Sequence, residues 1–251
     1  MGSALLNGLL AGGWAPVGEL AVSDPDPAQR ERLVAAHPGL TVVDAPVAAD
    51  GAVLAVKPEV AEGVCRTLAA AGIRRVLSIV AGLPAARLEA ALGDGVVVVR
   101  AMPNTPALVG AGVAALSGGD LAGSADLDWA EGILATVGTV VRLPERQLDA
   151  VTGLSGSGPA YVFLVAEALI EAGVLAGLPR AAARDLAVGT LSGSARMLAE
   201  TGEDPAVLRA RVTSPGGTTA AGLRILELKA VRSAFIEAVA SATERSRQLG
   251  R

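Results

Sequence analysis

The feature that most constrains the fold of this chain is the alternation of short apolar strands with helices over its first 145 residues. The segments predicted as strands are apolar and bounded by turn residues, and they span 19–24, 40–43, 51–58, 74–82, two parts of 95–119, and 139–143. Helical segments lie between them, at 27–37, 58–72, 84–93 and 126–138. This alternation predicts an α/β fold with a doubly wound, Rossmann-like sheet, which binds ligands at the carboxyl ends of its strands.

The strand signals stop after Pro144, and the remaining sequence has helical periodicity with Gly, Pro, Ser or Asp at the predicted boundaries. We therefore expect two domains, a dinucleotide-binding domain over 1–145 and an all-helical domain over 146–251. The helices within 159–176 and 230–249 are apolar on faces too wide for a lone bundle to bury. The sequence therefore predicts a homo-oligomer, with a ligand where the two domains meet.

Composition argues against several classes of function. The net charge of −4 argues against nucleic-acid binding, and the single cysteine, Cys65, favours the cytoplasm because it has no partner for a disulfide. With one cysteine and one histidine, His37, we expect neither a metal site nor a nucleophile activated by histidine. The apolar segment 158–178 contains Glu167 and Glu171, so it is predicted to be a buried helix rather than a membrane span, and no signal peptide is expected.

Three loops that follow predicted strands are candidates to contact a ligand. The first, 54–60, contains a lysine followed by a proline that ends the strand, and the second is 78–82. The third, 100–112, presents Asn104 and Thr105 between two prolines that restrict the backbone. Taken alone, each loop is also consistent with an ordinary strand-to-helix turn.

Two glycine-rich segments in the helical half have a stronger ligand-binding character. In 152–162, glycines and serines precede a helix whose free N–H groups would attract an anion, the alternative being a flexible linker. In 212–223, two glycines allow a ligand to approach the backbone, and Ser214, Thr218 and Thr219 supply hydroxyls at the start of a helix. A small carboxylate would fit there, the alternative being a capping turn with Thr218 at the N-cap.

Four stretches together resemble the pyrroline-5-carboxylate reductase family, namely LAVKP (54–58), RAMPNTPALVGAGVAAL (100–116), the segment 152–180 that contains SGSGPAY, and VTSPGGTTAAGL (212–223). The resemblance covers nearly the whole chain. It implies a dinucleotide-binding domain and a helical domain that dimerises by interleaving its helices, with dimers that gather into decamers. It also implies that NADPH, with NADH as the second choice, delivers a hydride to the C=N carbon of 1-pyrroline-5-carboxylate and so gives L-proline.

The family motifs, carried over to this chain, imply two sets of site residues. The cofactor would contact the ends of three strands, at Ala55, Val56, Lys57, Pro58, Ala81, Gly82, Met102, Pro103, Asn104 and Thr105. The carboxylate and ring nitrogen of the cyclic imino acid would contact Ser214, Gly216, Gly217, Thr218 and Thr219. In such dimers these residues come from the partner subunit, and Thr219 is assigned the catalytic role because its hydroxyl would lie beside the imine nitrogen.

The first residues match a phosphate-binding turn of this family that is half complete. Met1 and Gly2 correspond to the end of its G-x-G-x-M-G motif, with Gly2 as the third glycine, so both are expected at the cofactor. We expect the strand and two glycines that would precede Met1 to be absent, through a start codon assigned too late or a real truncation. Because that strand would be central in the sheet, we expect the chain as written to bind the dinucleotide poorly.

The choice between NADPH and NADH depends on the end of the strand at 19–24. Its last residues, Ser23 and Asp24, follow Gly2 by about 20 residues, where an acidic side chain favours the ribose hydroxyls of NAD. Ser23, with Arg30 or Arg32 on the next helix, would instead accept the 2′-phosphate of NADP. NADPH is preferred because of the family resemblance.

The predicted substrate domain is poor in groups that transfer protons, since the helix at 159–176 has neither lysine nor histidine. A hydroxyacid dehydrogenase needs such a group, whereas a cyclic imine is protonated by solvent and needs chiefly alignment. The residues therefore favour imine reduction. Two alternatives stay open: a catalytically inactive oligomer held together by its helical domain, and a related two-domain reductase of another imine or a hydroxyacid.

Overall fold

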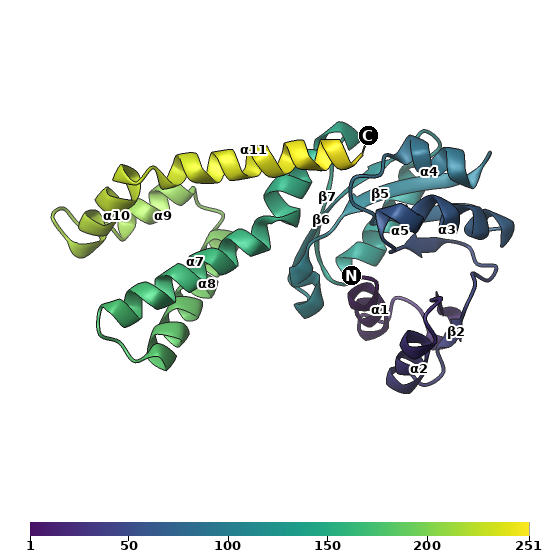
Figure 1. The fold of residues 1–251 in the computed structure, drawn as a ribbon, viewed down its shortest axis with the longest axis horizontal. Helices are drawn as coiled ribbons and strands as arrows, with labels where there is room; N and C mark the ends of the chain where they lie inside the picture. The colour runs from purple at the N-terminus through teal and green to yellow at the C-terminus, as the bar shows by residue number, and fades with distance from the viewer. Residues whose placement is uncertain (251) are drawn as a thin grey trace. The chain divides into compact units, whose positions relative to one another are not determined.

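The computed structural model describes residues 1–250 and divides into two compact units. The first contains residues 1–157 together with the chain from Ala240 onward, and the second is Gly158–Val239. The predicted doubly wound α/β architecture is confirmed in the first unit, and the second unit is helical (Figure 1). The two compact units separate after Ser157. The boundary between two functional domains after residue 145 stays a prediction.

The strands lie where the sequence predicts them. They are β1 (Ala21–Ser23), β2 (Thr41–Val43), β3 (Ala52–Leu54), β4 (Arg75–Ser78), β5 (Val97–Met102), β6 (Gly112–Gly118) and β7 (Gly138–Arg142). Strands β3 to β7 form one sheet in chain order, in which β3, β4 and β5 are parallel and β6 is antiparallel to β5. A separate parallel pair is formed by β1 and β2. The carboxyl ends of β3, β4 and β5 therefore share one edge of the sheet, where such folds bind ligands.

The helices of the first unit follow from local signals in the sequence. They are α1 (Gly2–Ala11), α2 (Pro27–Ala36), α3 (Pro58–Ala70), α4 (Ala85–Leu92), α5 (Ser124–Ala135) and α6 (Leu148–Val151), with short 3₁₀ turns η1 (Val17–Glu19), η2 (Thr105–Val109) and η3 (Glu145–Gln147). Proline occupies the first position of both α2 and α3, where its missing N–H costs nothing. Asp26 caps α2 by accepting a hydrogen bond of 3.0 Å from the N–H of Ala28.

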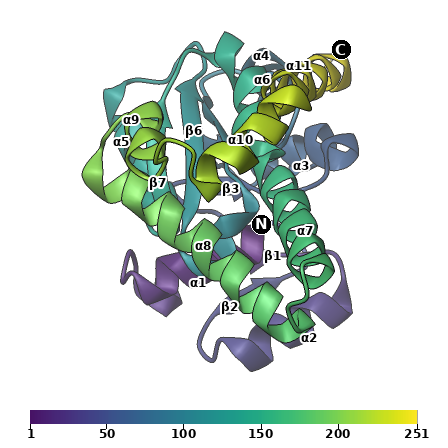
Figure 2. The ribbon, with the colours of Figure 1, turned by 90° about the vertical axis from the view of Figure 1, so that its left-hand side faces the viewer.

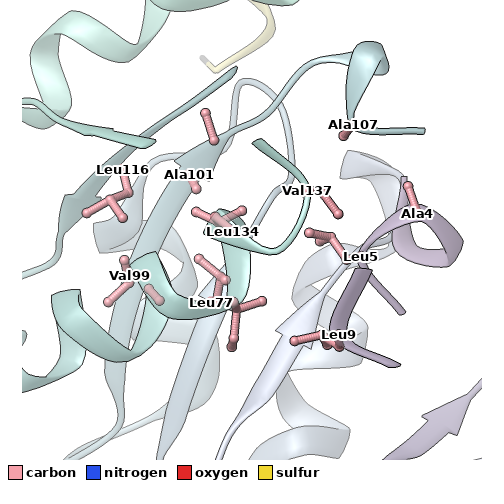
Figure 3. Close-up of a cluster of buried hydrophobic side chains, with 13 residues drawn as sticks. Ala4, Leu5, Leu9, Leu77, Val99, Ala101, Ala107, Leu116, Leu134 and Val137 are labelled. Carbon is pink, nitrogen blue, oxygen red and sulfur yellow. The ribbon is translucent and has the colours of Figure 1, made fainter. Parts of the chain in front are cut away.

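Two apolar clusters cover the two faces of the five-stranded sheet. On one face, α1 and α5 contribute Leu5, Leu9 and Leu134 to a cluster with alternate residues of β4 and β5 (Figure 3). On the other face, α3 and α4 contribute Cys65 and Leu88 to a cluster with the intervening residues of the same strands. Since successive strand residues point to opposite faces, this arrangement requires the near-continuous apolar strands that the sequence contains.

The second unit consists of α7 (Gly158–Leu175), α8 (Arg180–Thr201), α9 (Pro205–Arg211), α10 (Thr218–Leu228) and the first part of α11 (Val231–Leu249). Helices α7 and α8 pack side by side (Figures 1 and 2), and Ala183 and Ala187 of α8 are buried. Helix α7 itself has no buried residue, and its Phe163 is 62% exposed. A single chain therefore leaves this face uncovered, so burial of the helix over 158–178 depends on the predicted homo-oligomer and stays a prediction.

Helix α7 also belongs to a longer helical segment, Glu145–Leu175. Within the described residues this is the one helix that is long and apolar enough to cross a membrane, a criterion of length and composition alone.

The glycine-rich segment 152–162 is helical rather than a loop that opens onto a new helix. Thr152–Gly156 forms a π-helix that follows α6 directly, and the N–H of Ser157 donates to the carbonyl of Thr152 at 2.8 Å. A Cβ added at Gly156 would lie 2.5 Å from Cε of Met102. The expectation of a free helix N-terminus is therefore wrong, because the small residues serve close packing within a continuous helix.

Candidate active site

A cavity of about 780 Å³ lies between the two sheets of the first unit. Its walls include β1 and β3, which belong to different sheets, and the first turns of α1. Predicted cofactor residues from three separate stretches line it, namely Gly2, Ser23, Asp24, Ala55 and Val56. The structure thus brings the start of α1 and the carboxyl ends of two strands to one place.

The start of α1 lies very close to the end of β3. A Cβ added at Gly2 would lie 3.3 Å from Cβ of Ala55, so a larger residue at either position would crowd the other. The helix begins directly after Met1 and has no side-chain cap. Its first N–H groups therefore face the carboxyl end of the sheet without a protein cap, which is the arrangement that binds phosphate in dinucleotide folds.

The loop after β1 is held by two charged side chains. Asp24 accepts a hydrogen bond from the N–H of Asp26 at 2.9 Å through its carboxylate. Arg30, on α2, donates from Nη1 to the carbonyls of Asp24 and Pro25 at 2.8 and 3.0 Å. The sequence offers Arg30 or Arg32 for this region, and the structure places the Arg30 guanidinium at the loop.

The remaining predicted residues on β3 and β4 lie outside the lining of that cavity. Lys57 is exposed and occupies the N-cap position of α3, with Pro58 as the first helical residue. Ala81 is half-buried, and Gly82 is buried with a φ of 75°. A Cβ at Gly82 would lie 3.2 Å from Cβ of Leu249, so this glycine is required by a positive φ and by close packing.

The loop after β5 is fixed from within by Asn104. Its Oδ1 accepts from the N–H of Val113 at 2.8 Å, and its Nδ2 donates to the carbonyl and the hydroxyl of Ser155, both at 3.3 Å. Pro103 and Asn104 are buried, Met102 is half-buried and Thr105 is exposed. The amide of Asn104 thus joins this loop to the π-helix, a connection between distant residues that no local sequence pattern signals.

A second connection that the sequence does not signal joins β5 to η3. Arg100, only 7% exposed, donates from Nη1 to Oε1 of Glu145 at 3.0 Å. The same oxygen accepts from the N–H of Ala85 at 2.7 Å, at the start of α4. Glu145 therefore holds the end of the sheet and a helix terminus together, close in sequence to the π-helix that Asn104 contacts.

The predicted substrate residues lie in the second unit, where they form a tight turn into α10. The N–H of Gly217 donates to the carbonyl of Ser214 at 3.0 Å, with a proline second and Gly216 third in the turn. Gly216 has a φ of 71°, as a type II turn requires at this position. A Cβ at Gly217 would lie 2.3 Å from Oγ of Ser214, so the second glycine is required by space.

Helix α10 begins directly after this turn. The N-cap residue is Gly217, which has no side chain that could accept a hydrogen bond from the first N–H groups of the helix. The alternative of Thr218 as N-cap is therefore wrong. Thr218 is exposed and Thr219 half-buried in the first turn of the helix. Two hydroxyls and uncapped N–H groups therefore stand together, a combination suited to a carboxylate.

Cys65 is a buried thiol of the first unit. Burial raises the pKa of the Cys65 thiol to about 11, with a further increase from Glu62 and a decrease from Arg66. A thiol of this kind is unreactive at neutral pH. Among residues 1–250 there is no cluster of three His, Cys, Asp or Glu side chains that could hold a metal ion.

Comparison with known proteins relates both units to one family. The family model described as pyrroline-5-carboxylate reductase dimerisation matches residues 145–249. A pyrroline-5-carboxylate reductase of Synechocystis is 45% identical, with 100% of this chain and 95% of that protein covered. One of Corynebacterium melassecola is 42% identical, with coverages of 100% and 96%.

Solved structures give the same result. A pyrroline-5-carboxylate reductase of Coxiella burnetii matches with a TM-score of 0.92 at 34% identity, covering 100% of this chain and 95% of that one. A pyrroline carboxylate reductase of Plasmodium falciparum, solved with NADP bound, matches with a TM-score of 0.86 at 31% identity and the same coverages.

Proposed function

Because this chain belongs to the pyrroline-5-carboxylate reductase family, it is an oxidoreductase that reduces 1-pyrroline-5-carboxylate in proline biosynthesis, and we propose that NADPH is its hydride donor. The observation that carries the choice of cofactor is the position of Arg30 at the loop after β1. Its guanidinium has five N–H donors, more than its two contacts to backbone carbonyls use. A planar guanidinium at this point fits the 2′-phosphate that distinguishes NADPH from NADH.

The residues present supply part of a dinucleotide site at the carboxyl end of the cavity, namely the third glycine of the motif and the loop after β1. The close approach of Gly2 to Ala55 leaves no side chain between the α1 N-terminus and the end of β3. The carboxylate of Asp24, which also lines the cavity, accepts from the N–H of Asp26 through Oδ1. When bound, NADPH supplies a hydride, and this chain's residues position the pyrophosphate and the 2′-phosphate.

The turn into α10 is the proposed substrate site. A carboxylate would accept from the uncapped N–H groups of the first turn, and Ser214 and Thr218 would add hydroxyl donors. The Thr219 hydroxyl would lie at the ring nitrogen and hold the protonated imine in place. The hydride adds to the C=N carbon, and the nitrogen keeps the proton taken from water, so no titrating side chain is needed.

The protein is proposed to act as a cytoplasmic homo-oligomer. The dimerisation match and the exposed apolar residues of α7 support association of the chain with itself. Dimers that gather into decamers are the proposed assembly.

Steady-state kinetics with the two cofactors test the proposal. Arg30→Met should lower kcat/KM for NADPH by about 10- to 100-fold, because a charge-assisted bond to phosphate is lost. The value for NADH should change little. Arg32→Met, on the same helix, is the matched control and should leave both values near wild type. An equal loss with both cofactors would show that Arg30 only supports the loop, and NADPH would then lose its preference.

A further inference from the structure

The last part of α11 belongs to the first unit and packs against it with small residues. Thr243 and Ser246 are 8% and 3% exposed, whereas the two residues between them are exposed. Gly250 extends the same stripe, since residues three or four apart share a helix face and its N–H donates to the carbonyl of Ser246 at 3.3 Å. The small residues let the helix backbone come close to the chain beneath it.

Two glycines meet where the end of α11 reaches the turn after β4. A Cβ added at Gly250 would lie 2.5 Å from the carbonyl oxygen of Gly82. From the other side, a Cβ added at Gly82 would lie 3.2 Å from Cβ of Leu249. The contact is thus made by backbone, so a shift of the helix towards the turn cannot be absorbed by a change of rotamer. Such a shift must move the turn itself.

The position of α11 along the first unit is fixed by a hydrogen bond of Ser246. One helical turn before Gly250, its hydroxyl donates to Oδ1 of Asp149 at 2.7 Å. Asp149 lies on α6, beside the end of α11 (Figure 2). A hydrogen bond to a carboxylate is shorter and stronger than one between neutral groups. This bond therefore determines how far the helix reaches towards the turn after β4.

The turn after β4 is held at both of its ends by the segment that leads from η3 into α6. At one end, Glu145 accepts from the N–H of Ala85 at 2.7 Å. At the other end, Asp149 acts on Gly82 through the last turn of α11. The family resemblance implies that Ala81 and Gly82 contact the cofactor. The two attachments therefore restrain a part of the chain that is expected at the dinucleotide.

We propose that Ser246 and Gly250 are positioning residues for the dinucleotide, because they hold the turn at Gly82 in place. This inference rests on the dinucleotide site of the proposed function. The turn lies outside the lining of the cavity that contains the loop after β1, to which the 2′-phosphate is assigned. NADPH and NADH differ in that phosphate alone, so both residues should support the binding of either cofactor equally.

Calorimetric titration with NADP⁺ and NAD⁺ measures the effect on binding without turnover. In Gly250→Ala the new Cβ must displace the carbonyl of Gly82, so Kd for both dinucleotides should rise by the same factor, about 10-fold. Ser246→Ala, which removes one hydrogen bond, should raise both values about 3-fold. Gly63→Ala in the first unit is the matched control, because a Cβ there has open space, and it should change neither Kd.

Further measurements separate positioning from a merely structural role. Asp149→Asn keeps the acceptor for the Ser246 hydroxyl and should keep Kd near wild type, whereas Asp149→Ala should match Ser246→Ala. Without cofactor, the ¹H–¹⁵N amide signal of Gly82 should move in both α11 variants and stay in place in Gly63→Ala. KM for 1-pyrroline-5-carboxylate should change little throughout, since the proposed substrate turn lies in the second unit.

Two results would overturn the proposal. The first is a lower Tm of Gly250→Ala and Ser246→Ala with both Kd values unchanged, because α11 would then only stabilise the fold. The second is a higher Kd for NADP⁺ alone, which would place the effect at the 2′-phosphate. An equal loss with both cofactors in Arg30→Met would remove the preference for NADPH and leave the effect of Gly250→Ala on NAD⁺ intact, so the two proposals fail separately.

Discussion

Replacing Asn104 should destabilise the first unit, because its buried amide joins three backbone or side-chain groups. In Asn104→Leu, the N–H of Val113 loses its acceptor at 2.8 Å, and a buried donor left unpaired costs about 1–3 kcal/mol. Loss of the two longer bonds of 3.3 Å to Ser155 adds about 0.5 kcal/mol each. The sum predicts a loss of about 2–4 kcal/mol in the free energy of unfolding.

Thermal unfolding followed by tryptophan emission measures this loss in the first unit, since both tryptophans lie there. A loss of this size should lower Tm by about 4–16 °C at 2–4 °C per kcal/mol. Asn104→Asp keeps the acceptor for Val113 but sets a buried carboxylate oxygen against the carbonyl oxygen of Ser155, so it should cost at least as much as Asn104→Leu. Ser155→Ala removes a single weak bond and should lower Tm least. If Asn104→Leu costs no more than Ser155→Ala, the amide does not hold the loop and our reasoning is refuted.

Three further predictions concern the second unit and the buried thiol. Thr219→Val should lower kcat/KM for 1-pyrroline-5-carboxylate about 5- to 160-fold, a loss of about 1–3 kcal/mol in transition-state stabilisation. Thr218→Val, which alters a more exposed hydroxyl, should cost less, and unchanged kinetics would remove Thr219 from the site. Ile236→Glu alters a side chain that is 70% exposed in the second unit, and it should lower the molar mass measured by light scattering to that of the monomer. Val34→Glu alters a side chain that is 55% exposed in the first unit, and it should leave the molar mass unchanged. Cys65, with its pKa raised to about 11, should resist alkylation in the folded protein until the pH approaches that value. Because the buried thiol favours its neutral form, its contribution to the free energy of unfolding should be lost as the pH rises from about 9 towards 11. Rapid alkylation at pH 8 would contradict the burial.

Local signals in the sequence determined most of the secondary structure. The strands after residue 20 were predictable because each is a short apolar run ended by glycine or proline, and α2 and α3 because each begins with proline. The turn into α10 was predictable for the same reason, since the positive φ of Gly216 is a local requirement of the backbone. The family was indicated by the resemblance of four stretches of the chain to its motifs.

The tertiary structure alone decided which of these residues meet. Asn104 and Ser155 are far apart in sequence, and their hydrogen bonds depend on the sheet bringing β5 to the π-helix. The sequence predicts Gly156 in a loop because glycine is locally a loop residue, yet Gly156 lies in a helix, where contact with Met102 leaves no room for a Cβ. Glu145 likewise joins β5 to the start of α4 through Arg100 and Ala85, and contacts between such distant segments are contained in no local pattern.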